Sequence, residues 1–303
     1  MLSQNYSILG LLHVGYTIHN MESAVSFWVD LLGIKRCRQQ FIDHEYIGRI
    51  TGIKDCACKI AFIQQSDDKN MVELLEYIRP PDNTLLQKPG TPSHVHMAYL
   101  TNDILTYYED LKSKGANYMI DPVIIDYGFY KGYLSFWITD PLGNYLQIIG
   151  KPKAETGICR AIGLGKVCFN VTDITKSVTV FNELLGFDVV VEDTSKSAFL
   201  SNFCEAVPKK VATCLSKTSR VVVELWETPG NHVYTRPSTK GTLHLCFLVK
   251  GIDNAYHEFT TKGIEFSAAK PEEIIAGINK GAKAVYFKLP GNIWVEIFEG
   301  KPT

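Results

Sequence analysis

The sequence of 303 residues lacks a surplus of either charge, a long apolar run and an ordered set of cysteines. Its formal net charge is -1, so there is no basic field to attract nucleic acid or an anionic membrane. No apolar run approaches the roughly 20 residues that span a bilayer, and residues 1–14 lack the charged start and cleavage site of a signal peptide. The eight cysteines follow no framework, which favours free thiols in a reducing compartment. We therefore expect a cytoplasmic protein without nucleic-acid or membrane partners.

What the sequence does contain is typical of a globular protein of two domains. Apolar residues make up 46% of the chain and charged residues 21%. A length of 303 residues favours two domains of about 150 residues each. We expect the first domain at 1–150 and the second at 151–303, with a linker at 151–157, KPKAETG.

The segment Leu11–Gly33, LLHVGYTIHNMESAVSFWVDLLG, predicts a strand that carries a histidine, a short turn and an amphipathic helix. Side chains alternate between the two faces of a strand. One face should therefore carry small or polar residues, namely His13, Gly15 and Thr17. The other should carry Leu12, Val14, Tyr16 and Ile18, covered by the helix through Ala24, Phe27, Trp28, Leu31 and Leu32.

This strand–helix unit recurs three more times, at 95–115, 165–186 and 243–263. Each copy has an Asp or Asn near the helix start, which suits an N-cap, and a glycine at the helix end. The closing segments repeat as well: 72–76 matches 223–227, and 140–147 matches 289–296. The sequence therefore predicts an α+β fold of four similar modules arranged in two pairs.

Four motifs, LLHVGYTI, MVELLEY, VHMAYLTNDI and DPLGNYLQI, occur in this order in the first half of the chain. In this order and spacing they resemble the vicinal oxygen chelate superfamily, which includes glyoxalases, methylmalonyl-CoA epimerases, extradiol dioxygenases and bleomycin-resistance proteins. The resemblance covers nearly the whole chain. It implies four βαβββ modules paired into two glyoxalase-like cupped-sheet domains, each built around a metal site.

Carried over to this sequence, the resemblance implies a metal site in the first domain formed by His13, Glu73, His96 and Gln147. Such a set suits one divalent ion, either Zn, Fe, Mn, Co or Ni. Gln147 replaces the usual glutamate, and an amide cannot take up a proton as a carboxylate does. We therefore expect Glu73, or an acid at Asp43 or Glu45, to be the catalytic base. The alternative for each residue is a polar side chain on a strand with no metal role.

The equivalent positions of the second domain are Lys166, Glu224, His244 and Glu296. A lysine ammonium has no lone pair to offer a metal ion, so this second site is altered. A Lys⁺ between carboxylates can instead stand in the place of a divalent ion, as a buried ion network. A metal site with three ligands remains the alternative.

Together these features predict a metal-dependent isomerase, epimerase or lyase that chelates the vicinal oxygens of a small substrate and stabilises an enediolate. One alternative is an extradiol-type Fe(II) dioxygenase, because two histidines and a carboxylate can form a facial triad. Another is a non-catalytic, resistance-type protein that binds a small molecule. A homodimer is a possible assembly.

Overall fold

The computed structural model describes residues 5–65, 70–117, 120–152 and 161–301, and it is an α+β fold. Most of the linker expected at 151–157 lies outside these residues. No helix in the described part of the chain is long and apolar enough to cross a membrane. The seven described cysteines are free, as expected.

The four modules occur as predicted, each with a strand, a helix and three further strands. The first contains β1 (Ser7–Thr17), α1 (Met21–Ser26) with a π-helical turn (Phe27–Leu31), β2 (Arg36–Asp43), α2 (Glu45–Thr51), β3 (Ala57–Gln64) and β4 (Met71–Arg79). The second contains β5 (Val95–Thr101), α3 (Ile104–Ser113), β6 (Val123–Ile124), β7 (Leu134–Thr139) and β8 (Tyr145–Gly150).

The third module contains β9 (Ala161–Val171), α4 (Ile174–Glu183), β10 (Asp188–Asp193), α5 (Ala198–Phe203), β11 (Lys210–Leu215) and β12 (Val222–Glu227). The fourth contains β13 (Leu243–Lys250), α6 (Ile252–Thr261), β14 (Glu272–Glu273), β15 (Lys283–Leu289) and β16 (Ile293–Glu299). The short helices α2 and α5, which precede β3 and β11, were not predicted from the sequence.

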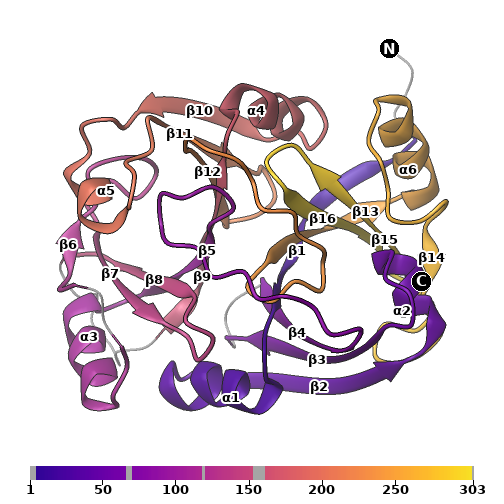
Figure 1. Ribbon diagram of the computed structural model, residues 1–303, viewed down its shortest axis with the longest axis horizontal. Helices are drawn as coiled ribbons and strands as arrows, with labels where there is room; N and C mark the ends of the chain where they lie inside the picture. The colour runs from indigo at the N-terminus through magenta and orange to yellow at the C-terminus, as the bar shows by residue number, and fades with distance from the viewer. Residues whose placement is uncertain (1–4, 66–69, 118–119, 153–160, 302–303) are drawn as a thin grey trace.

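The strands form two eight-stranded sheets, and each sheet combines modules from both halves of the chain (Figure 1). The first has the order β14-β15-β16-β13-β1-β4-β3-β2, and the second has the order β10-β11-β12-β9-β5-β8-β7-β6. The sequence-based expectation pairs module one with two, and three with four. The structure instead pairs one with four and two with three, because β1 is antiparallel to β13, and β5 to β9.

Local sequence signals account for where the module helices begin and end. The side chains of Asn20, Asp103 and Asp173 each accept a hydrogen bond from the backbone of the first helical turn. Each module helix is followed by a glycine with positive φ, a conformation that glycine adopts without strain. These glycines are Gly33, Gly115, Gly186 and Gly263, at φ 74°, 81°, 70° and 83°.

The apolar residues form one shared core and one smaller core in each cup. Both sheets and all four module helices contribute to the shared core, where Phe27 and Trp28 are buried as predicted. The smaller cores contain residues of α2 in the first cup and of α5 in the second. Leu12 differs from its predicted face, because the register of β1 against β13 shifts between Leu11 and His13. It packs in the first cup, on the side of His13.

Candidate metal centre

Four neighbouring strands of the first sheet bring two histidines and two glutamates together. His13 of β1 lies opposite Cys246 of β13, and Cys246 is paired in turn with Glu296 of β16. In the adjacent row, Gly15 separates His244 of β13 from Glu73 of β4. Paired residues of neighbouring strands point to the same face, so all four side chains enter one cup.

The four donor atoms lie close enough together to bind one ion. His13 Nε2 is 3.2 Å from Glu73 Oε2, 3.3 Å from Glu296 Oε2 and 3.4 Å from His244 Nε2. His244 Nε2 is 3.7 Å from Glu73 Oε2 and 3.5 Å from Glu296 Oε2. Ligands that bind a single ion at about 2.0–2.2 Å lie about 3.0–3.6 Å from each other. These residues therefore fit a divalent metal ion.

Burial and charge explain the protonation of the centre in the absence of an ion. Burial by itself would lower the pKa of His13, but Cys246, Glu73 and Glu296 outweigh it and raise this pKa well above its usual value. Burial opposes ionisation of Glu296, yet its hydrogen bonds to His13 and His244 lower its pKa to about 2. His13 therefore holds a proton and forms a buried ion pair with Glu296, and a metal ion can take the place of that proton.

The hydroxyl of Tyr286 and the backbone of Gly15 complete the surroundings of His244. Tyr286 lies beside Glu296 in the sheet, and its hydroxyl is 3.0 Å from His244 Nε2. The His244 ring lies against Gly15, where an added Cβ would meet ring atoms at 1.8–2.3 Å. Only a glycine at this position leaves room for the imidazole.

Helix α2 covers the cup over the centre. Ile47 and Ile50 of α2 line a narrow cavity of about 40 Å³ together with His13, Glu73 and Glu296. Tyr46 fixes the helix through a hydrogen bond of 3.2 Å from its hydroxyl to the carbonyl of Ala276. The donor atoms thus face a small, mostly apolar space.

The structure places His96 and Gln147 in the second sheet, apart from His13 and Glu73. His96 lies between the rings of Trp137 and Trp226, with centroids at 4.5 and 5.1 Å. Burial, followed by the charge of Lys166, lowers the pKa of His96 well below its usual value. The amide of Gln147 donates a hydrogen bond of 2.9 Å to Ser135. The expected set of His13, Glu73, His96 and Gln147 is therefore not brought together.

The expected second set of Lys166, Glu224, His244 and Glu296 is divided between the sheets in the same way. Lys166 Nζ lies 2.9 Å from Glu224 Oε2, and both side chains are buried. The indole of Trp226 donates a second hydrogen bond of 3.0 Å to the same carboxylate oxygen. The ammonium thus neutralises Glu224 inside an aromatic cup, as the expected buried ion network requires, but Glu296, the second carboxylate expected there, lies in the other sheet.

The strand registers make the two cups equivalent position by position. Cys168 is paired with His96 and Glu224, just as Gly15 is paired with His244 and Glu73. In the next row, Ala98 is paired with Lys166 and Gln147, just as Cys246 is paired with His13 and Glu296. Lys166 therefore occupies the position of His13, and Gln147 that of Glu296.

The sequence contained a signal for the correct set. A module of the first half can share a sheet with either module of the second half. If module one shares a sheet with module four, His13 and Glu73 come together with His244 and Glu296. Every position of that set carries a metal-ligand side chain, whereas any set with module two or three includes Gln147 or Lys166. The expectation that modules adjacent in the sequence share a sheet led to a different set of residues.

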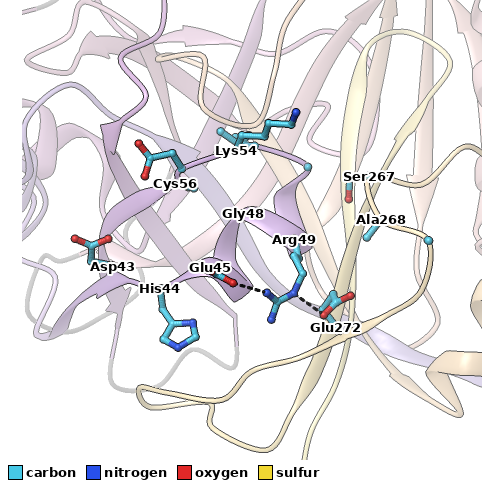
Figure 2. A pocket seen from close by; sticks show the side chains of 14 residues that line it. Asp43, His44, Glu45, Gly48, Arg49, Lys54, Cys56, Ser267, Ala268 and Glu272 are labelled. Carbon is cyan, nitrogen blue, oxygen red and sulfur yellow. Dashed lines mark hydrogen bonds and ion pairs between the residues drawn. The ribbon is translucent and has the colours of Figure 1, made fainter.

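Asp43 and Glu45 face a larger hollow of about 910 Å³ on the outer side of α2 (Figure 2). Asp43 forms an ion pair of 2.6 Å with Arg79. Arg49 forms ion pairs with Glu45 at 3.4 Å and, across the hollow, with Glu272 at 3.0 Å (Figure 2). These acids are bound to arginines outside the cup, whereas Glu73 lies inside it among the four donor atoms.

The protein has two cupped sheets, one of which carries a cluster of histidines and glutamates. Comparison with known proteins identifies the class of protein to which it belongs. Models of the Glyoxalase/Bleomycin resistance protein/Dioxygenase superfamily match residues 10–148 and 166–286. The chain belongs to this superfamily, with two copies of the family unit in tandem. No curated protein sequence matches the chain.

Solved structures of similar fold span almost the whole chain. Glyoxalase I from Zea mays is 18% identical, covers 97% of this chain and 93% of its own, and superimposes with a TM-score of 0.65. A mutant form of the same maize enzyme gives a TM-score of 0.66, with 18% identity and 97% and 94% coverage. A candidate dioxygenase from Bacillus subtilis is 13% identical, with a TM-score of 0.65 and coverage of 98% and 86%. These likenesses concern the fold.

Proposed function

We propose that the chain is a metal-dependent enzyme that binds one divalent ion through His13, Glu73, His244 and Glu296. The proposal rests on the convergence of two imidazole nitrogens and two carboxylate oxygens within 4.8 Å of one another. Nitrogen and carboxylate ligands suit Zn²⁺, Fe²⁺, Mn²⁺, Co²⁺ and Ni²⁺. The two carboxylates also balance the charge of such an ion, which makes its burial favourable.

The reaction that this centre supports best is isomerisation, epimerisation or lyase chemistry on a small oxygenated substrate. A divalent ion there would supply Lewis-acid polarisation of a carbonyl and its neighbouring oxygen. Glu73 borders the narrow cavity and is the base that we assign to proton transfer at the adjacent carbon, with an enediolate as the product of that step. The hydroxyl of Tyr286 lies 3.0 Å from His244 Nε2, and when an ion occupies that nitrogen we assign the hydroxyl as a hydrogen-bond donor to a substrate oxygen.

A second candidate function is an Fe(II) dioxygenase. His13, His244 and one of the two carboxylates supply the two-histidine, one-carboxylate set that suits Fe²⁺ and O₂ chemistry. Oxygen uptake that depends strictly on Fe²⁺ would favour this candidate. Turnover under nitrogen with Zn²⁺, Co²⁺ or Ni²⁺ would favour the isomerase or lyase.

Elemental analysis of the purified protein tests the metal centre. We expect one ion per chain in the parent, its loss in His13→Ala and in His244→Ala, and its retention in His96→Ala, the matched histidine of the second cup. Retention in both first-cup variants, with loss in His96→Ala, would move the centre to the other sheet. A parent that binds no ion, yet retains small chelating molecules at one per chain, would be a sequestering protein.

Proton exchange tests the chemistry separately from metal binding. Small 2-hydroxy ketones in D₂O should exchange the hydrogen next to the carbonyl in the presence of the loaded parent, as followed by NMR. Glu73→Gln keeps a carbonyl oxygen that can still bind the ion but has no basic carboxylate, so it should keep the metal and lose the exchange. Glu45→Gln, which changes an acid of the outer hollow, is the control and should leave both unchanged.

A further inference from the structure

A cavity of about 360 Å³ adjoins the metal centre on the side away from α2, and His13 forms part of its wall. Strands β2 and β3 contribute Arg38 and Phe62, and Ile278 and Phe298 come from module four. Sites for small organic ligands begin at about 300 Å³. The cavity therefore has room for a substrate body, whereas the space directly under α2 does not.

The wall of this cavity is mostly apolar. Phe62 and Met71 come from the first module, and Ile278 and Phe298 from the fourth. The side chain of Ile278 is large and apolar, yet 45% of the residue's surface is exposed. Exposed apolar surface beside a polar centre is typical of a site that binds an organic molecule.

Arg38 and His13 are the ionisable side chains among the described lining residues. Arg38 is paired with Phe62 across β2 and β3, and Phe62 is paired with Glu73 across β3 and β4. Arg38 and Glu73 therefore lie in one row on one face, about 9–10 Å apart at the backbone. Within the described part of the chain, no residue forms an ion pair or side-chain hydrogen bond with Arg38.

We infer that this cavity binds the body of the substrate and that Arg38 selects substrates with a carboxylate at the end opposite to the vicinal oxygens. A guanidinium presents two parallel N–H donors that match a carboxylate. Arg38 is exposed, so its guanidinium lies at the mouth of the cavity, and its single charge balances that of one carboxylate. The substrate class is thus a small monoanion with two adjacent oxygens, an apolar middle and a terminal carboxylate. The inference rests on the proposed metal centre.

A matched pair of chelators tests the role of Arg38. 4-Carboxybenzohydroxamic acid and 4-methylbenzohydroxamic acid both offer two adjacent oxygens on an apolar ring and differ in the terminal carboxylate. Binding to the Zn²⁺-loaded protein is measured by calorimetry, with the metal content checked afterwards. We expect the parent to bind the carboxylate probe about tenfold more tightly, as a charge-assisted pair of hydrogen bonds would give.

Arg38→Met should abolish this preference and leave the affinity for the methyl probe unchanged, whereas Arg38→Lys should keep part of it. Arg49→Met, which removes an arginine of the outer hollow, should behave as the parent. Equal binding of the two probes to the parent, or a preference that survives in Arg38→Met, would overturn the inference.

The two proposals fail in different ways. If the parent binds Zn²⁺ but neither hydroxamate, the cavity does not serve the metal, and the assignment of Arg38 falls while the metal centre stands. If the parent binds no metal, the proposed function falls and takes this inference with it.

Discussion

The imidazole of His244 lies directly over the α-carbon of Gly15 on the neighbouring strand. A methyl group at position 15 would come within 1.8 Å of ring atom Cε1 of His244. The absence of a side chain on β1 thus determines where a ligand of β13 can lie. A glycine that looks like a small residue on the polar face of a strand is thus part of the proposed metal centre.

Gly15→Ala should therefore displace His244 and weaken metal binding by about 10–100-fold, the range seen when the support of a metal ligand is altered. The strand itself should persist, since alanine is tolerated in a strand. Competition with a chelator measures the metal affinity, and circular dichroism reports the fold. Gly300→Ala is the control, because a Cβ added at Gly300 would meet no other atom within 4 Å. Equal affinities in the two variants would contradict this account of Gly15.

The stability of the metal-free protein should depend on pH on both sides of an optimum. The pKa of Glu296 falls from 4.5 to about 2 on folding, so its contribution is present above pH 4.5 and is lost as the pH falls toward 2. The pKa of His13 rises above 6.5, so its contribution is present below pH 6.5 and is lost as the pH rises through the folded value. Burial lowers the pKa of His96 and also that of His94, so these two side chains add a loss of stability as the pH falls below 6.5. The optimum should therefore lie close to pH 6.5.

Thermal unfolding of the metal-free protein across this range measures the effect, which amounts to at most about 1.4 kcal/mol per pH unit for each proton. The shifts of Glu296 and His13 describe one ion pair, so their contributions are not added. His13→Gln should flatten the alkaline side of the curve. Saturating Zn²⁺ should reverse its slope above pH 6.5, because metal binding requires unprotonated ligands. An unchanged alkaline slope in His13→Gln would refute this origin.

Lys166→Met should destabilise the protein strongly without changing its metal content. The substitution leaves the buried carboxylate of Glu224 without its counter-ion, which costs about 3–5 kcal/mol in comparable cases. Urea unfolding measures the loss. Lys176→Met removes an exposed lysine that lies 3.5 Å from Asp173, and it should have no measurable effect. Similar stabilities for the two variants would mean that the Lys166–Glu224 pair is not important for the fold.

Lys166→His combined with Gln147→Glu should create a second metal site. The matching strand registers place these positions where His13 and Glu296 lie in the first cup, and the second cup already has His96 and Glu224. His96 Nε2 has no hydrogen-bond partner there within the described structure and is available as a ligand. Elemental analysis should give two ions per chain, against one for Gln147→Glu with Lys166 retained, because the ammonium keeps a cation out of the cup. One ion in both would show that the aromatic side chains leave no space.

Much of this arrangement could be predicted from the sequence, because the governing interactions are local. Alternation on the strands, the N-caps such as Asn20 and the glycines such as Gly33 define each module within its own residues. His13 and Glu73 were predicted together from the family resemblance, and they do lie together because β1 and β4 are neighbours whose register brings both side chains to one face.

The pairing of modules could not be predicted in this way. The contact between β1 and β13 is formed largely by backbone hydrogen bonds, which are the same for any first strand that presents an equivalent edge. The strand and helix patterns of the modules resemble one another, so they do not distinguish module two from module four as the partner of module one; only the ligand side chains differ. The placement of His96 and His244 depends on that choice, and so does the shift at Leu12, which arises from the contact itself.

The pairing of β1 with β13 also affects the order in which the protein matures. Because Glu296 belongs to β16 and His13 to β1, a growing polypeptide on the ribosome cannot complete the proposed ligand set until β16 has been synthesised. Uptake of the ion would then follow the synthesis of β16, and the bound cation would hold module one and module four together across the sheet.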